Sequence, residues 1–212
     1  RAWGRSWSGG LFAPAPNAGK TTQFYRHLSR YASAFALSVD MTLLTLGGDL
    51  KRKEMISARF GDLLSELYLL SAVLKRWQDE GRQDADLPLV EWCMHSGMVT
   101  IATRFDEIFA NFPNRLVAGL LRLIIQPLGP RRRGPSDSLT RACATLILEP
   151  SATRDRLTVD LFHPKDDGGL ARLEVAFKLT AATQSLRDRI NKAHVHDIDQ
   201  ALKQKFIDAS EA

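Results

Sequence analysis

The sequence has few cysteines and lacks the short motifs of common catalytic centres. Its 212 residues include two cysteines, Cys93 and Cys143, which form no CxxC pair. This spacing gives no support to a zinc site or a redox motif, and we expect both thiols to be reduced and to lie in the core. The chain also has no G-x-S-x-G, H-E-x-x-H or Gly-rich dinucleotide motif. A hydrolase elbow, a zinc peptidase site and a dinucleotide-binding fold therefore receive no support.

Neither sign of charge dominates the sequence. Lys and Arg number 29 and Asp and Glu number 24, which gives a formal net charge of +5 at pH 7. This small excess disposes the surface toward anions but does not indicate a nucleic-acid partner, and we predict none. Hydrophobic residues make up 44% of the chain and charged residues 25%, as in ordinary globular proteins. The chain begins at Arg1 with neither a Met nor a signal segment, so we expect it to be part of a longer protein.

Apolar residues recur at intervals of three and four along most of the chain, which predicts amphipathic α-helices. A pattern that could be read as a strand is confined to residues 156–162. Predicted helices begin near Thr22, Asp49, Pro88, Arg115, Ser136 and Leu170, the first two run to Gly47 and Gly81, and the last segment is helical through residues 198–206. Thr21, Thr22, Asp49 and Ser136 are the expected caps. The predicted fold class is all-α, a multi-helix bundle with long antiparallel helices.

Composition divides the chain into three parts. Residues 1–20 are rich in Gly, Ser, Ala and Pro and are predicted to be an extended linker. Residues 21–163 carry the helical patterns of the bundle. A polar, turn-like stretch begins at Pro164, and residues 164–212 are predicted to form C-terminal helices that pack on the bundle.

A basic loop follows the most apolar predicted helix. Residues 115–126 are nearly all apolar, and Arg131, Arg132 and Arg133 follow in a Pro/Gly context. The helix is shorter than the roughly 20 residues that a bilayer-spanning helix needs. Helix and loop together could instead form a surface that binds anionic lipid headgroups. A buried helix followed by a solvated basic loop is the plainer alternative.

A near match to a phosphate-binding loop occurs at residues 14–21, PAPNAGKT. It departs from G-x-x-x-x-G-K-[ST] at its first position, where Pro14 has no N–H to donate. The downstream chain also predicts helices where a nucleotide switch would need an α/β sheet. A nucleotide-binding role for Lys20 is therefore the weakest of the alternatives.

Other reactive side chains have ordinary structural interpretations. His194 and His196 are two residues apart and have no cluster of ligands around them, so we expect surface histidines rather than a metal site. His95 lies two residues from Cys93, and nothing else supports a nucleophile and base there. Arg59, Asp62 and Glu66 are spaced as a solvated ion-pair face of one helix.

Several long runs of the sequence resemble one enzyme family. They are LKRKEMISARFGD at residues 50–62, LKRW at 74–77, DEGRQ at 79–83, NFPNRLVAGLL at 111–121 and PSD at 135–137. These runs resemble the C-terminal helical region of the large bacterial acyl-CoA dehydrogenases of fatty-acid β-oxidation. The layout is similar to that of the C-terminal extension of very-long-chain acyl-CoA dehydrogenases, which contributes to membrane association.

The resemblance implies FAD-dependent oxidation of a fatty acyl-CoA to a trans-2-enoyl-CoA. In such enzymes a glutamate removes the α proton and flavin N5 accepts the β hydride. The resemblance implies that both groups lie before Arg1, so no catalytic, cofactor-binding or metal-binding residue is assigned to this chain. The implied partners are the upstream flavin domains, acyl-CoA, an anionic membrane surface and a second copy of the protein. The implied location is the cytoplasm or the inner face of the membrane.

A stand-alone helical module that binds lipid or a protein partner is the alternative from a different functional class. It rests on the apolar helix 115–126 and on Arg131, Arg132 and Arg133. Co-sedimentation with anionic vesicles tests the lipid-binding module. A variant with the three arginines changed to Glu should bind such vesicles less than the parent does, and equal binding would exclude the module.

Overall fold

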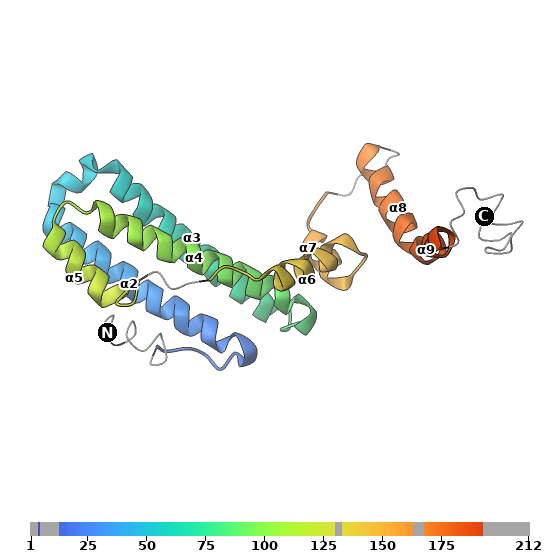
Figure 1. The fold of residues 1–212 in the computed structure, drawn as a ribbon, viewed down its shortest axis with the longest axis horizontal. Helices are drawn as coiled ribbons and strands as arrows, with labels where there is room; N and C mark the ends of the chain where they lie inside the picture. The colour runs from blue at the N-terminus through green and yellow to red at the C-terminus, as the bar shows by residue number, and fades with distance from the viewer. Residues whose placement is uncertain (1–3, 5–12, 130–132, 163–167, 193–212) are drawn as a thin grey trace, which may run out of the picture. The chain divides into compact units, whose positions relative to one another are not determined.

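The computed structural model describes residues 4, 13–129, 133–162 and 168–192, and within these ranges the chain is helical and has no strand. This confirms the predicted all-α class (Figure 1). The helices are α2 (Thr22–Leu46), α3 (Glu54–Asp79), α4 (Leu87–Asn111), α5 (Arg115–Ile125), α6 (Asp137–Leu148), α7 (Ala152–Thr158), α8 (Gly169–Ala182) and α9 (Gln184–Lys192). Short 3-10 turns lie at η1 (Gly19–Thr21), η2 (Gly47–Arg52) and η3 (Asp84–Asp86).

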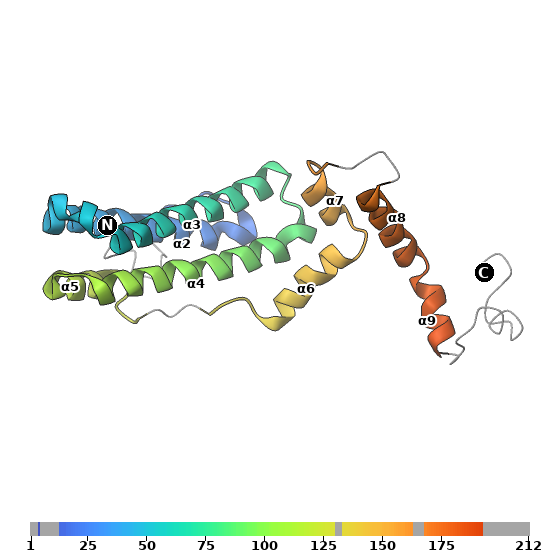
Figure 2. The same ribbon diagram turned by 90° about the horizontal axis from the view of Figure 1, so that it is seen from above.

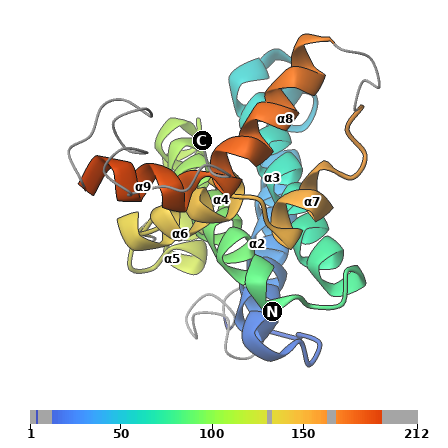
Figure 3. The same cartoon turned by 90° about the vertical axis from the view of Figure 1, so that its right-hand side faces the viewer.

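The chain divides into two compact units, Arg1–Cys143 and Ala144–Ala212. In the first unit, α3 packs against both α2 and α4, and α5 contacts α2 and α4. The three long helices run antiparallel to their neighbours in sequence (Figure 2), and an end-on view shows a bundle rather than a flat layer (Figure 3). The buried stripe of α3 fills the centre with Ile56, Phe60, Leu63, Leu67, Leu70, Leu74 and Trp77.

One glycine allows α3 and α4 to approach closely. A Cβ added to Gly97 of α4 would lie 2.3 Å from Glu66 Oε1 and 2.7 Å from Leu70 Cδ2, both on α3. Separations this short are well inside van der Waals contact, so a larger residue would push the helices apart or displace these side chains. Gly97 therefore sets the spacing of the most extensive helix pair in the unit.

Buried polar groups attach α5 to the rest of the bundle. Arg30 of α2 is 8% exposed, and its Nη2 donates to the Ile125 carbonyl at 2.9 Å. Gln126 Nε2 donates to the Ala102 carbonyl of α4 at 2.9 Å. The guanidinium also suits the negative end of the α5 dipole. The carboxyl end of α5 is thereby joined to α2 and α4.

The predicted caps are partly confirmed. Ser136 Oγ accepts from the Leu139 N–H at 3.2 Å, as expected for the start of α6. Thr21 takes the N-cap position of α2, but its side chain makes no capping bond. The prediction for Asp49 is wrong, because α3 begins only at Glu54 and Asp49 lies inside η2. Its carboxylate accepts from Arg52 at 2.9 Å, so the ion pair replaces the expected bond to a backbone N–H.

The second unit differs from the expectation at two points. The single long helix expected to begin near Leu170 is broken into α8 and α9 at Thr183, whose hydroxyl donates to the Leu179 carbonyl at 2.8 Å. Side-chain bonds of this kind compete with the helical ladder. Residues 156–158 belong to a helix rather than a strand. The helix predicted at 198–206 lies outside the described residues, and the division at residues 20 and 163 stays a prediction.

Candidate functional site

The short helix α5 is apolar on two faces. Ala118, Leu121 and Ile125 are buried against the bundle. On the opposite side, Leu116, Leu120 and Leu123 are 86%, 50% and 56% exposed, and their spacing of four and three residues places them on one stripe. We call these three residues the α5 stripe. Exposed apolar side chains gathered on one helix face are typical of a binding surface rather than of a solvated one.

The basic groups around the α5 stripe are only partly available. Arg133 is exposed, whereas Arg131 and Arg132 lie outside the described residues. Within α5, Arg122 forms an ion pair with Asp106 of α4, and Arg115 Nη1 donates to the Ala110 carbonyl at 2.6 Å. The structure thus describes exposed apolar side chains on α5, but of the three arginines predicted to bind anionic headgroups it describes Arg133 alone.

Two ion pairs of α3, those of Arg59 and Asp62, connect this helix to α4. Arg104 of α4 contacts Asp62 of α3 at 3.1 Å, and Arg59 of α3 contacts Glu107 of α4 at 3.4 Å. Arg104 also binds Glu107 at 2.7 Å. The expected pairing of Arg59, Asp62 and Glu66 along α3 is therefore wrong for Arg59 and Asp62, because the α4 side chains offer closer partners. The hydrogen bond from Arg104, with smaller contributions from Arg59, lowers the pKa of the Glu107 carboxyl.

The two cysteines are poor nucleophiles. Both are free, with Cys143 buried and Cys93 half-buried. Burial, followed by the charge of Glu66, raises the pKa of Cys93, and burial raises the pKa of Cys143. A raised pKa lowers the thiolate fraction that catalysis needs. His95 packs edge-on against Phe24, with ring centroids 5.8 Å apart, which favours a packing role.

The phosphate-loop alternative finds no geometric support. Lys20 lies in η1 at the start of α2, and its Nζ contacts Asp84 at 3.1 Å in an exposed ion pair. The described residues that follow this loop form helices, whereas a nucleotide switch would need an α/β sheet. His194 and His196 lie outside the described residues. Across the described ranges no group of three or more His, Cys, Asp or Glu side chains could hold a metal ion.

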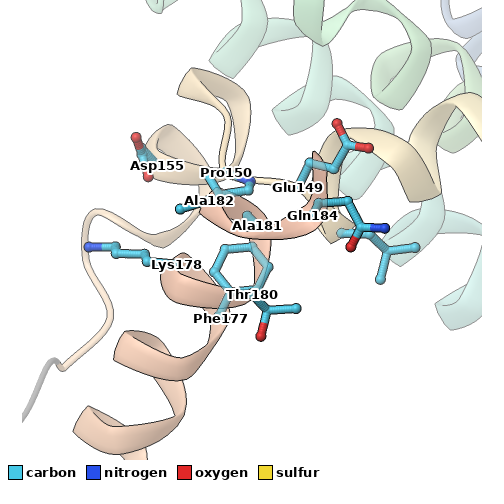
Figure 4. Close-up of a pocket in the computed structure, with 10 residues that line it drawn as sticks. Glu149, Pro150, Asp155, Phe177, Lys178, Thr180, Ala181, Ala182 and Gln184 are labelled. Carbon is cyan, nitrogen blue, oxygen red and sulfur yellow. The ribbon is translucent and has the colours of Figure 1, made fainter. Parts of the chain in front are cut away.

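The second unit contains a pocket of about 910 Å³ beside Phe177. Its wall includes the Phe177 ring, Pro150, Ala181 and Ala182, and Glu149 and Asp155 lie toward opposite ends of it (Figure 4). Lys178, Thr180 and Gln184 supply further polar groups. The two carboxylates would repel the pyrophosphate of FAD, and no glycine of a Gly-rich loop is among the lining residues, although Gln184 at the start of α9 is. This donor set does not fit a flavin.

Sequence reasoning missed two features of this unit. Arg154 of α7 makes a two-point ion pair with Glu174 of α8, with both N···O distances 2.9 Å, and its guanidinium lies 4.2 Å from the Phe177 ring centroid. A separation of 20 residues gives no local signal of such a pair. The exposed apolar side chains of α8 were also missed. A signal for them was present in the sequence, because the polar residues of this segment do not gather on one helix face.

None of the helices in the described ranges is both long and apolar enough to cross a bilayer.

The comparison with known proteins agrees with the resemblance seen in the sequence. A family model described as acyl-CoA dehydrogenase, C-terminal, bacterial type matches residues 1–212. No solved structure matches the chain. Because the family model covers the whole sequence and the described residues form the helical bundle that the resemblance implies, the chain belongs to the family of C-terminal domains of bacterial-type acyl-CoA dehydrogenases.

Proposed function

We propose that this chain is the accessory helical domain of an FAD-dependent enzyme that oxidises fatty acyl-CoA to trans-2-enoyl-CoA. The observation that carries the proposal is the family match over residues 1–212. The flavin, the acyl-CoA site and the catalytic glutamate belong to domains outside this chain. The contribution of the chain is to support those domains or the subunit contacts of the enzyme.

The exposed surface of α8 supports a role in assembly. No residue of α8 is buried, and Leu170, Leu173, Val175 and Leu179 are each more than half exposed. Among the described residues of the second unit, Thr153 is the one that is buried. A helix that is apolar on several faces is normally covered in the complete protein. The flavin domains of the same polypeptide or those of a second subunit are the surfaces we expect to cover it.

A substitution on α8 of the full-length enzyme tests this role. Leu173→Asp places a charge where an apolar side chain would be covered, and we expect less assembled, flavin-loaded enzyme and lower turnover of fatty acyl-CoA. Thr180→Asp, an equally charged change at an exposed polar position of the same helix, is the control. Size-exclusion chromatography with flavin absorbance provides the measurement. Equal assembly and turnover of the two variants would contradict an assembly role for α8.

Membrane association is a second proposal, favoured by the α5 stripe. The domain would lie in the cytoplasm and bind the inner face of the membrane through Leu116, Leu120 and Leu123, with Arg131, Arg132 and Arg133 near anionic headgroups. Co-sedimentation with vesicles of phosphatidylglycerol tests it. The variant with all three arginines changed to Glu should bind less than the parent chain, and binding equal to that of the parent would defeat the proposal.

A further inference from the structure

A second recess of the second unit, which we call the Leu170 pocket, differs in chemistry from the pocket beside Phe177. It has a volume of about 450 Å³ and lies between the end of α7 and the first half of α8. Its apolar lining comes from Leu161, Phe162, Leu170, Ala171 and Val175, and its polar lining comes from Arg154, Thr158, Glu174 and Lys178. The volume falls in the range of about 300–1,000 Å³ that is typical of small-ligand sites.

The polar groups at the base of the Leu170 pocket already satisfy one another. Arg154 and Glu174 form the two-point ion pair, and the Thr158 hydroxyl donates to the Arg154 carbonyl at 3.0 Å. The Arg154–Glu174 pair joins α7 to α8, the Thr158 bond lies within α7, and neither needs a ligand. The charges of Arg154 and Glu174 cancel, so this pair adds no net charge to the pocket.

Lys178 gives the pocket its net positive charge. Within the described part of the chain its ammonium has no ion pair with a carboxylate. The same side chain lines the pocket beside Phe177, so it lies where the two recesses adjoin. Among the described residues, a ligand in the Leu170 pocket therefore meets one cation at its edge that is not paired with a carboxylate.

The apolar walls are incompletely covered. Leu161 is 61% exposed and Phe162 is 80% exposed, although both line a recess. Leu170 and Val175 are also more than half exposed. Covering these side chains would remove apolar surface from water, and three of the four are aliphatic, which suits a flexible hydrocarbon chain better than a planar ring.

We propose that the Leu170 pocket binds the hydrocarbon chain of a free fatty acid, with the ligand carboxylate paired to Lys178. Apolar walls with a cation at their edge select an aliphatic anion over a neutral hydrocarbon and over a cation. The proposed site does not depend on the function proposed above, because its test measures binding to the isolated chain.

The proposal predicts a dependence of affinity on ligand length. Isothermal titration calorimetry of residues 1–212 with hexanoate, octanoate and decanoate, each below its micelle concentration, measures it. Each methylene that enters the pocket should strengthen binding by up to about fourfold. Decanol, which lacks the charge, should bind at least several-fold more weakly than decanoate. Affinity that is independent of length, or equal affinity for decanol, would overturn the proposal.

Variants locate the site. Lys178→Glu and Val175→Asp should each weaken decanoate binding at least tenfold, because one reverses the cation and the other places a carboxylate on the apolar wall. The controls are Lys75→Glu on α3, which also reverses a cation, and Leu44→Asp on α2, which also replaces an aliphatic side chain by a carboxylate. Both positions are exposed in the first unit, and both variants should bind decanoate as the parent does. Circular dichroism checks that each variant is folded. Loss of binding in the controls, or no binding by the parent, would show that the pocket is not the site.

Discussion

At the scale of single residues, two glycines in neighbouring helices differ in what surrounds them. Gly97 of α4 faces Glu66 and Leu70, whereas nothing lies within 4 Å of a Cβ added to Gly61 of α3. We expect Gly97→Val to lower the free energy of unfolding by about 1–3 kcal/mol, as overpacking does. Gly61→Ala should raise it by up to about 1 kcal/mol, since alanine is the better helix former. Urea denaturation checks both, and a neutral Gly97→Val would show that the helices are not in close contact there.

The Arg104–Glu107 contact gives stability a defined pH dependence. The pKa of Glu107 is lowered in the folded state, so its contribution is present above the unfolded pKa of about 4.3 and is lost as pH falls through the folded value. Glu107→Gln should therefore destabilise the chain at pH 7 and destabilise it less at pH 3, where more of the Glu107 carboxyl is protonated. Denaturation curves at both pH values provide the measurement. A difference between variant and parent that is unchanged by pH would contradict the role of the ionised carboxylate.

Thiol reactivity tests the burial of the cysteines. Because the pKa values of Cys93 and Cys143 are raised, both side chains should hold less thiolate than a free cysteine at pH 8. Alkylation by iodoacetamide, followed by mass spectrometry, should be slower in the native chain than in urea. Cys143 is 8% exposed, so it should be modified last. Rapid native modification of Cys143 would contradict the packing of α6.

At the scale of elements, two adjacent leucines of α5 have different roles: one is buried in the core and the other lies on the exposed α5 stripe. Leu121 is 1% exposed and Leu120 is 50% exposed. Leu121→Ala should cost about 2–5 kcal/mol in unfolding free energy, because it leaves a cavity. Leu120→Ala should stay within about 0.5 kcal/mol of the parent, and it should reduce vesicle binding if the α5 stripe is the membrane surface. A large stability loss from Leu120→Ala would show that the stripe is part of the core.

Elements with a clear apolar period were predictable, and those that depend on distant partners were not. The heptad-like spacing from Ile56 to Leu74 identifies the buried side of α3, and Pro88 correctly indicates the start of α4. The role of Asp49 was not predictable, because a bond to Arg52 competes with capping over the same few residues. The Arg59–Glu107 contact spans 48 residues, and such pairings are specified by helix packing rather than by local sequence.

At the scale of the whole molecule, the family match supports our proposal that this domain assists redox chemistry carried out by other domains. The reactive side chains are engaged elsewhere, with Lys20 paired to Asp84 and His95 packed on Phe24. The candidate surfaces are apolar: the α5 stripe in the first unit and α8 in the second. The sequence could predict the fold and the family, because both rest on long continuous runs. The exposed surfaces depend on tertiary packing, which single-sequence patterns do not contain.

The most direct test of this account is a flavin titration of the purified chain, residues 1–212, beside the full-length enzyme from which it comes. We predict that the isolated chain, folded by circular dichroism, retains no FAD through gel filtration and does not oxidise fatty acyl-CoA, while the full-length enzyme does both. Stoichiometric FAD on the isolated chain, or turnover by it, would contradict the central claim that this helical domain supports chemistry carried out by other domains.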